Sequence, residues 1–266
     1  FLMIRRPPSS TQGVSSAASD VYKRQDHDIR IIIPKYGFVS ERKYILREVI
    51  RLREIEFDFD GKEEVSSAKS AFIPKTRVQV YFLEDVNWFK PLTNLLYKSK
   101  NGRVLPDNDL RYGYFSKASI ATLPHLFWKP DVLICNGWQS AFVPLIYKQI
   151  YDSQDFYGGI KTVLLIHSID DEYCTFSRSS YDKAGVELPK NIKGNKVNCY
   201  EAAAPFADLI IAVDSKSNNV TKKLLALPGI KAHKKKLISI SIPEGESPSY
   251  IDSARILNDE LTKHFA

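Results

Sequence analysis

The chain has 266 residues, 44% of them hydrophobic and 26% charged, a composition typical of globular domains rather than of disordered or fibrous proteins. Its three cysteines, Cys135, Cys174 and Cys199, are too few and too widely spaced for a disulfide framework or a zinc site, which is consistent with the cytoplasm. No stretch reaches the roughly 20 apolar residues that cross a bilayer. The basic residues behind the net charge of +7 form no nucleic-acid-binding motif, so we expect neither nucleic acid nor a membrane as partner.

Residues 1–25 do not resemble a folded protein. They are rich in Ser, Pro and Arg, show neither helical nor strand periodicity, and start without an initiator methionine. They resemble translated adaptor sequence, and we therefore expect a disordered, non-native leader at 1–25 and one folded domain at 26–266. On this interpretation the true N-terminus is missing.

From residue 26 onwards, short apolar runs are predicted to be strands. Most of them are continuously apolar, which is typical of parallel strands that are covered on both faces. Residues 52–59 instead alternate between apolar and polar side chains, which indicates an antiparallel addition at one edge of the sheet. The predicted buried strands are 29–33, 78–83, 131–135, 161–166, 208–213 and 237–242.

Helices are predicted between these strands. The apolar spacing favours helices at 107–123, 138–146, 215–227 with Ser215 as its cap, and 249–265. Residues 168–196 are polar and are predicted to form a long loop, and loops of that length are usually functional or mobile. The alternation of strands and helices predicts an α/β fold with a doubly wound, mainly parallel, Rossmann-like sheet.

Several motifs follow one another along this framework. They are HDIRIIIPKYG at 27–37, VQVYFLED at 78–85, DNDLRYGYFSKA at 107–118 and PDVLICNGWQSAFVPLIYK at 130–148, followed by TVLLIHS and FADLIIAVDS. In this order and at this spacing they resemble the starch-synthase catalytic domain family of glycosyltransferases, over residues 27 to about 215. Each motif alone is weak evidence for the family, and the resemblance depends on their order and spacing together.

The resemblance implies one half of a GT-B glycosyltransferase, in which two Rossmann-like domains face each other across a cleft. It implies a retaining hexosyltransferase that moves glucose from ADP-glucose to the non-reducing end of an α-1,4-glucan, with no cofactor and no required metal. The N-terminal domain mainly holds the glucan, and the second domain mainly holds the nucleotide sugar. The implied partners are glycogen or maltooligosaccharide, a nucleotide sugar, and either a separate C-terminal domain or a second copy of the chain.

His167 ends the predicted strand at 161–166, at the carboxyl edge where open α/β sheets bind ligands. It matches the histidine of the family's T-x-H-N motif, which lies against the transferred glucose, so the resemblance makes it the catalytic candidate. A neutral imidazole donates or accepts a hydrogen bond to a sugar hydroxyl without needing a counter-charge. The alternative is a histidine whose hydrogen bonds are satisfied by the loop backbone.

Residues 136–139 stand where the family has D-W-H, and the match is partial. Trp138 is kept, whereas Gly137 replaces the aspartate and Gln139 replaces the histidine. The resemblance assigns Asn136, Trp138 and Gln139 to substrate binding, although Gln139 cannot titrate. Trp138 also begins the apolar face of a helix, which favours a place in the core over stacking on a sugar.

The D-N-x-x-R pattern is matched by Asp107, Asn108 and Arg111, and Tyr97 falls where the family has a tyrosine that contacts the acceptor. The resemblance places these four residues on the glucan side. The simpler alternatives are that Asp107 caps its helix and that Arg111 pairs with it at i, i+4. The acidic run at 170–172 suggests a metal or acid–base site, but consecutive residues point in different directions, which favours a solvated loop.

Two features separate this chain from a complete synthase. The family's Lys-x-Gly-Gly-Leu loop, whose backbone N–H groups and lysine meet the donor diphosphate, falls in the leader and is missing. The pair Gly158-Gly159 precedes a strand and is interpreted as a turn. Together with the altered 136–139 motif, this keeps open an alternative: a non-catalytic module that binds α-glucan or a partner protein and has lost the donor site. The helix at 249–265 resembles a natural C-terminus.

Overall fold

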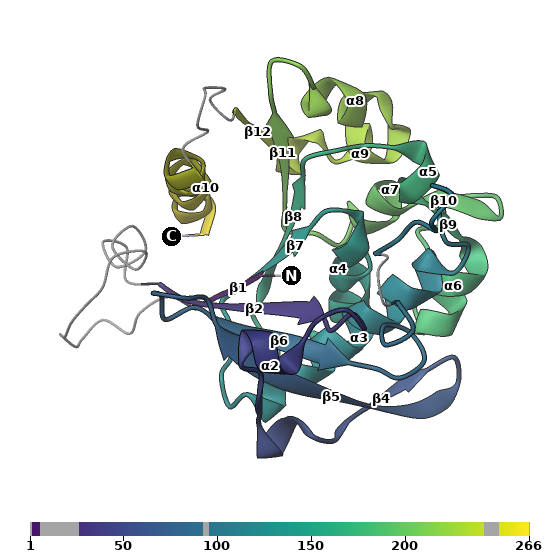
Figure 1. The fold of residues 1–266 in the computed structure, drawn as a ribbon. Coiled ribbons are helices and arrows are strands. Elements are labelled where there is room, and N and C mark those ends of the chain that lie inside the picture. The colour runs from purple at the N-terminus through teal and green to yellow at the C-terminus, as the bar shows by residue number, and fades with distance from the viewer. Residues whose placement is uncertain (1, 6–26, 93–95, 242–249, 266) are drawn as a thin grey trace.

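The computed structural model describes residues 2–5, 27–92, 96–241 and 250–265, and Figure 1 shows their arrangement. A twisted sheet runs through the molecule, with helices on both of its faces. In spatial order its strands are β12 (Leu237–Ser241), β11 (Leu209–Asp214), β8 (Lys161–Ile166), β7 (Val132–Asn136), β1 (Leu2–Arg5), β2 (Asp28–Pro34), β6 (Gln79–Glu84), β5 (Lys62–Phe72) and β3 (Arg47–Glu48).

The parallel part of the sheet confirms the predicted fold class and all six predicted buried strands. β12, β11, β8 and β7 pair in parallel, and so do β2 and β6. β7, β8 and β11 are almost entirely buried at their interior positions, as continuous apolar runs require when both faces are covered, whereas β2, β6 and the edge strand β12 are buried only in part.

The predicted antiparallel addition is also confirmed. β4 (Ile55–Phe59) pairs with β5 as a hairpin, and β5 in turn pairs with β6. The alternation follows burial, since Ile55, Phe57 and Phe59 are buried and the residues between them are exposed. The turn consists of Asp60 and Gly61, both with positive φ, which is typical of a two-residue hairpin.

The structure differs from the expected disordered leader at its first residues. Leu2–Arg5 form β1, which lies between β2 and β7 and runs antiparallel to both. Met3 is fully buried there, so an apolar run of only a few residues completes the middle of the sheet. Residues 6–26, the rest of the expected leader, lie outside the described residues.

The helices pack on both sides of the sheet. α3 (Asn108–His125), predicted at 107–123, is buried along most of its length between the sheet and the outer helices. The predicted helix at 138–146 is divided into a 3-10 turn η2 (Trp138–Ser140), α4 (Val143–Ile146) and a π-helical turn η3 (Tyr147–Tyr151). α10 (Tyr250–Phe265) corresponds to the predicted helix at 249–265 and lies on the opposite face (Figure 1).

The predicted helix at 215–227 begins later than expected. α8 (Val220–Ala226) is capped by Asn219, whose side chain accepts from the backbone N–H of Lys222, while Ser215 closes a turn before it. α9 (Pro228–Ala232) and the short η4 (Lys234–Lys236) follow α8. Gly158-Gly159 is a turn, as predicted, with Gly159 at positive φ before β8.

The long loop predicted at 168–196 is wrong, because this segment forms short regular elements. It contains α5 (Asp171–Cys174), β9 (Thr175–Ser177), α6 (Arg178–Ala184) and the start of β10 (Lys196–Asn198), which pairs with β9. Asp109 of α3 fixes this segment, because its carboxylate accepts from the Ser177 backbone N–H and hydroxyl, each at 2.8 Å. α7 (Cys199–Ala203) follows β10 directly.

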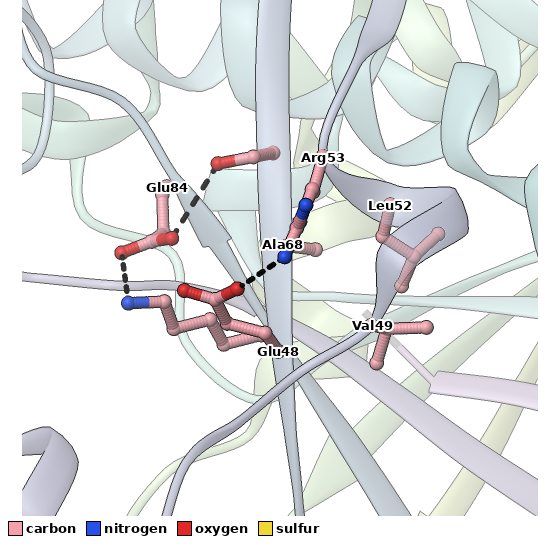
Figure 2. A pocket seen from close by; sticks show the side chains of 8 residues that line it. Glu48, Val49, Leu52, Arg53, Ala68 and Glu84 are labelled. Carbon is pink, nitrogen blue, oxygen red and sulfur yellow. Dashed lines mark hydrogen bonds and ion pairs between the residues drawn. The ribbon is translucent and has the colours of Figure 1, made fainter.

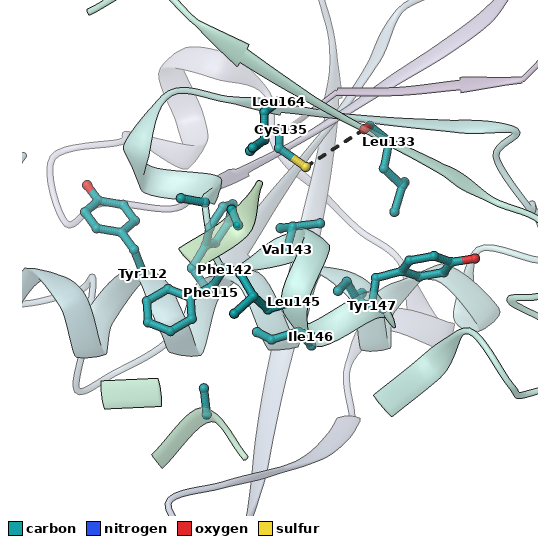
Figure 3. Packing of buried hydrophobic residues seen from close by; sticks show 14 of the residues in the cluster. Tyr112, Phe115, Leu133, Cys135, Phe142, Val143, Leu145, Ile146, Tyr147 and Leu164 are labelled. Atoms are coloured by element: carbon teal, nitrogen blue, oxygen red, sulfur yellow. Dashed lines mark hydrogen bonds between the residues drawn. The ribbon is translucent and has the colours of Figure 1, made fainter. Parts of the chain in front are cut away.

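Each face of the sheet has its own hydrophobic core. The larger core lies under α3, α4 and α7 and includes Trp138, Phe142 and Tyr112, and Figure 3 shows part of it around Cys135 of β7. The smaller core lies under α10, whose Leu261 packs against strand residues such as Val163 and Ile211. Fully burying one such large apolar side chain contributes about 1.5–3 kcal/mol. In the described part of the chain, no helix combines the length and apolar character that crossing a membrane requires.

Gly37 of the PKYG motif is expected to be intolerant of any side chain. A Cβ at this position would lie 2.1 Å from the carbonyl oxygen of Lys90, a backbone atom that cannot move aside cheaply. We expect Gly37→Ala to lower the free energy of unfolding by about 1–3 kcal/mol. Gly158→Ala is the matched control: its Cβ meets nothing closer than 3.9 Å, so its effect should stay within about 0.5 kcal/mol. Urea unfolding of both variants measures the difference, and equal stabilities would contradict the packing described here.

Candidate functional site

The candidate site lies where β7 and β8 end side by side. The two strands are parallel, with Asn136 opposite Leu165, and the Gly137 N–H continues the pairing by donating to the Leu165 carbonyl at 2.9 Å. Asn136 closes β7, and His167 directly follows β8. The carboxyl ends of the two strands therefore bring the 136–139 motif and His167 to one edge of the sheet, as predicted.

Gly137 is the point at which these residues meet. Its φ is +70°, a backbone conformation that favours glycine. A Cβ at this position would lie 2.9 Å from Oε1 of Gln139 and 3.4 Å from Cε1 of His167. Any side chain at Gly137 would be strained by this φ and would require Gln139 to shift.

The imidazole of His167 is free of hydrogen-bond partners within the described part of the chain. The residue is exposed, and among the described residues no group hydrogen-bonds to its ring. Its backbone carbonyl accepts from the Asn218 side chain at 3.4 Å. This favours a free imidazole over the alternative of a histidine satisfied by loop backbone.

The charge of His167 is set by its surroundings. Protein atoms around part of the ring remove water from it, which disfavours the charged form and lowers the pKa of His167 below its ordinary value. The ring is therefore neutral at pH 7, with one donor and one acceptor nitrogen.

Asn136 and Gln139 complete the polar set. Asn136 is exposed and Gln139 is partly exposed, and within the described part of the chain neither side-chain amide hydrogen-bonds to the protein. Each amide offers two donors and an acceptor, the inventory that sugar hydroxyls match. Two amides and a neutral imidazole thus lie at one edge of the described structure without internal hydrogen-bond partners, and those of Gln139 and His167 meet beside Gly137.

Trp138 lies under this polar set and belongs to the core. It is buried, with Tyr173 stacked on it at 5.8 Å and 15° and Tyr112 edge-on at 4.9 Å. Phe176 contacts it at 6.3 Å. A sugar cannot stack on this ring while Tyr173 covers it, which favours the core interpretation of Trp138 over the predicted contact with substrate.

Tyr97 and Asn108 join the same cluster from the other side. The half-buried Tyr97 ring packs edge-on against Trp138 at 5.7 Å and against Tyr173 at 5.3 Å. Asn108 is buried, and its side-chain amide donates to the Tyr97 carbonyl at 2.9 Å. Asn108 therefore positions Tyr97, and Tyr97 is the member of this pair with surface left for a ligand.

Asp107 and Arg111 hold the start of α3. The Arg111 guanidinium is buried and donates to the Asp107 carboxylate at 2.5 Å and to the Trp88 carbonyl. It also lies over the Trp88 ring, 5.8 Å from the ring centroid. The pairing alternative is thereby supported for Arg111. Asp107 takes the cap position, but its carboxylate caps no helix N–H. Both residues are thus used in holding the start of α3 and Trp88.

The acidic run after His167 is a solvated turn. Asp170 caps α5 by accepting from the Glu172 N–H at 3.0 Å, and residues 170–172 are exposed. Among the described residues, no group of three or more His, Cys, Asp or Glu side chains is arranged to hold a metal ion.

A separate polar hollow of about 420 Å³ lies beside β3, β5 and the end of β6, on the antiparallel side of the sheet (Figure 2). Its charges are paired: Lys69 contacts Glu41 at 2.7 Å and Glu84 at 3.7 Å, and Arg53 contacts Glu48 at 3.0 Å. Hydrogen bonds from Lys35 and Lys69 lower the pKa of Glu41 to about 2. Because these charges neutralise one another, the hollow is a weaker ligand site than the edge at His167.

The sequence did not reveal the aromatic wall of Tyr112, Tyr173 and Phe176 or this network of ion pairs. Tyr112 lies within the 107–118 motif and could have been included as a helix neighbour of Asn108. Tyr173 and Phe176 fall in the segment predicted to be a loop. The ion pairs of Lys69 reach Glu41 and Glu84, which lie 28 and 15 positions away in other elements, so no local pattern indicates them.

Comparison with known proteins gives consistent matches. Residues 13–223 match the family described as "Starch synthase catalytic domain". The match begins within the expected leader, at residues outside the described part of the chain. The glycogen synthase of Chlorobium limicola is 31% identical over 192 residues, which are 71% of this chain and 39% of that protein. The glycogen synthase of Pelodictyon phaeoclathratiforme is 35% identical over 55% of this chain and 30% of that protein.

Among solved structures, the fold is similar to the catalytic domain of starch synthase IV from Arabidopsis thaliana bound to ADP and acarbose. The TM-score is 0.65 at 22% identity, covering 89% of this chain and 50% of that one. The chain thus spans well under half the length of these glycogen synthases. Because the family match covers most of the chain, from residue 13 to 223, the chain belongs to the starch synthase catalytic domain family.

Proposed function

We propose that this chain is the glucan-side half of a glucosyltransferase of the glycogen synthase type. Its relatives are named glycogen synthases, and the starch synthase IV domain with the similar fold is bound to ADP and acarbose. On this proposal the chain holds an α-1,4-glucan, and ADP-glucose supplies the glucose. The donor lies mainly on a second domain, in the same polypeptide or a separate one.

One observation carries the proposal: the free polar side chains of Gln139 and His167 meet beside Gly137, at the carboxyl ends of β7 and β8, where the exposed Asn136 ends β7. Trp138, between Gly137 and Gln139 in the chain, is buried and packs against Tyr173. Sugars present many hydroxyls and few charges, and a neutral set of donors and acceptors suits them better than paired charges do.

In the proposed reaction, the bond between the anomeric carbon of glucose and the ADP phosphate oxygen breaks, and a bond to a hydroxyl oxygen of the glucan forms. The hydroxyl proton leaves with the ADP. His167, kept neutral by its surroundings, hydrogen-bonds a hydroxyl of the transferred glucose and orients it without adding a charge. Positioning of this kind lowers the barrier by holding the reacting atoms in register.

Other parts of the proposal rest on the family resemblance alone. They are that transfer retains configuration, that it needs no cofactor and no metal, and that it takes place in the cytoplasm. The same holds for the identity of the partner that completes the donor site, a separate C-terminal domain or a second copy of the chain.

Glucan binding tests the proposal directly. We expect the chain to bind maltohexaose in calorimetry, and His167→Ala and Gln139→Ala each to weaken binding about 2- to 10-fold, because each removes a hydrogen bond worth about 0.5–1.5 kcal/mol. His233→Ala, a change near η4 and away from this edge, is the matched control and should bind as the unmodified chain does.

Two outcomes separate the possible functions. Release of ADP from ADP-glucose together with a maltohexaose lengthened by one glucose would show transfer by the chain itself. Glucan binding without any heat on adding ADP-glucose would favour the non-catalytic glucan-binding module. If every variant at this edge bound glucan as tightly as the unmodified chain, that result would contradict the site.

The titration of His167 tests the neutral role proposed for its ring. Burial disfavours the charged ring, so its midpoint should lie below the ordinary value of 6.5, and the ring should be neutral above that pH. Bound glucan displaces more water and should lower the midpoint further. Proton NMR of the ring signals, assigned with His167→Ala, measures both midpoints. A midpoint above 6.5, or one that rises when maltohexaose binds, would contradict the neutral role given to His167.

A further inference from the structure

Cys174 and Cys199 are brought together by strand pairing, although 24 residues separate them in the sequence. β9 and β10 are antiparallel, with Ser177 opposite Lys196 and Thr175 opposite Asn198. Cys174 directly precedes β9 and Cys199 directly follows β10, so continuing this register by one position would set Cys174 opposite Cys199. Directly opposed residues of an antiparallel pair have Cα atoms about 4.5–5.5 Å apart, within the roughly 4.4–6.8 Å range over which disulfides form.

The side chains confirm this proximity. The Cys199 thiol is close enough to lower the pKa of Cys174, and each residue is only 1% exposed. The third cysteine, Cys135, lies in β7 within the sheet, where its Sγ contacts the Leu133 carbonyl of the same strand at 3.9 Å (Figure 3). The pair is therefore set apart from the remaining thiol by the fold itself.

We propose that Cys174 and Cys199 are a modification site, at which a low-molecular-weight disulfide oxidises the two thiols to an intrachain disulfide. The spacing of the cysteines in the sequence gave no indication of this pairing. The site is distinct from the glucan edge, and its existence does not depend on the proposed transferase function.

The exchange takes place in two steps. The Cys174 sulfur attacks one sulfur of the small disulfide, forms a mixed disulfide and releases one thiolate. The Cys199 sulfur then attacks the Cys174 sulfur, the mixed bond breaks and the second thiolate leaves. Both thiol protons pass to the released thiolates, so the two cysteines lose two electrons and the small disulfide gains them.

The environment gives the two cysteines different roles. The hydrogen bond that the Cys199 thiol donates lowers the pKa of Cys174, whereas burial raises the pKa of Cys199. Cys174 is therefore the attacking sulfur. It ends the single turn of α5, whose Asp171 and Glu172 are exposed, and the proposal requires this turn to open.

The proposed bond would fasten the wall of the candidate site. Tyr173 and Phe176, on either side of Cys174, both pack on Trp138. Tyr200, next to Cys199, donates through its hydroxyl to the carbonyl of Ser168 at 3.4 Å, one residue after His167. Oxidation would thus tie α5 to α7 directly behind His167.

The experiment uses the whole chain and oxidised glutathione as the probe. After incubation we expect one free thiol of the original three, a mass lower by two hydrogen atoms, and a peptide map in which Cys174 and Cys199 are joined. Dithiothreitol should restore all three thiols. The cross-link closes a loop of 24 intervening residues, so the oxidised chain should melt roughly 5–10 °C higher than the reduced one.

Variants separate the proposed pair from other chemistry. Cys135→Ser should oxidise to a chain with no free thiol, while Cys199→Ser should stop at a glutathione adduct on Cys174. Peptide mapping of the unmodified chain decides the matter even where a variant fails to fold. A disulfide that includes Cys135, stable glutathione adducts on both Cys174 and Cys199, or three unchanged thiols would each overturn the proposal.

Discussion

The parallel pairing of β7 with β8 is the constraint on which the site depends. Its last bond, from the Gly137 N–H to the Leu165 carbonyl, fixes where one chain segment leaves the sheet beside the other. Only a residue that tolerates positive φ can turn there, and the absence of a Cβ lets Gln139 and His167 approach the same backbone atom. The polar edge is thus a consequence of strand register and one glycine, and each side chain in it follows from that turn.

The rigidity of this edge comes from the aromatic layer beneath it. Trp138 is held by Tyr97, Tyr112, Tyr173 and Phe176, which come from separate parts of the chain. Edge-to-face and stacked pairs of this kind add about 0.5–1.5 kcal/mol each beyond their burial. Because Trp138 is fixed by these partners, the backbone on either side of it, at Gly137 and Gln139, is held in place before any ligand arrives, which reduces the entropy that binding must overcome.

The strands could be predicted because their continuous apolar runs reflect burial on both faces, a property of each segment alone. His167 could be placed for the same reason, since the end of a parallel strand defines an edge. The elements within 168–196 could not be predicted, because β9 and α5 are too short to show a period and depend on the distant carboxylate of Asp109. β1 could not be predicted because its four residues are too few to show a strand pattern and because a segment rich in Ser, Pro and Arg follows them.

Mapping of bound maltohexaose by NMR on the isotope-labelled chain tests the central claim most directly. The site described here predicts that the Gly137 backbone amide, the Gln139 side-chain amide and the His167 ring shift on binding. The indole of Trp128, which precedes β7 at the opposite end of the strand and lies under Arg30, should not shift. Shifts confined to the hollow around Lys69, or at Trp128 without Gly137, would contradict it.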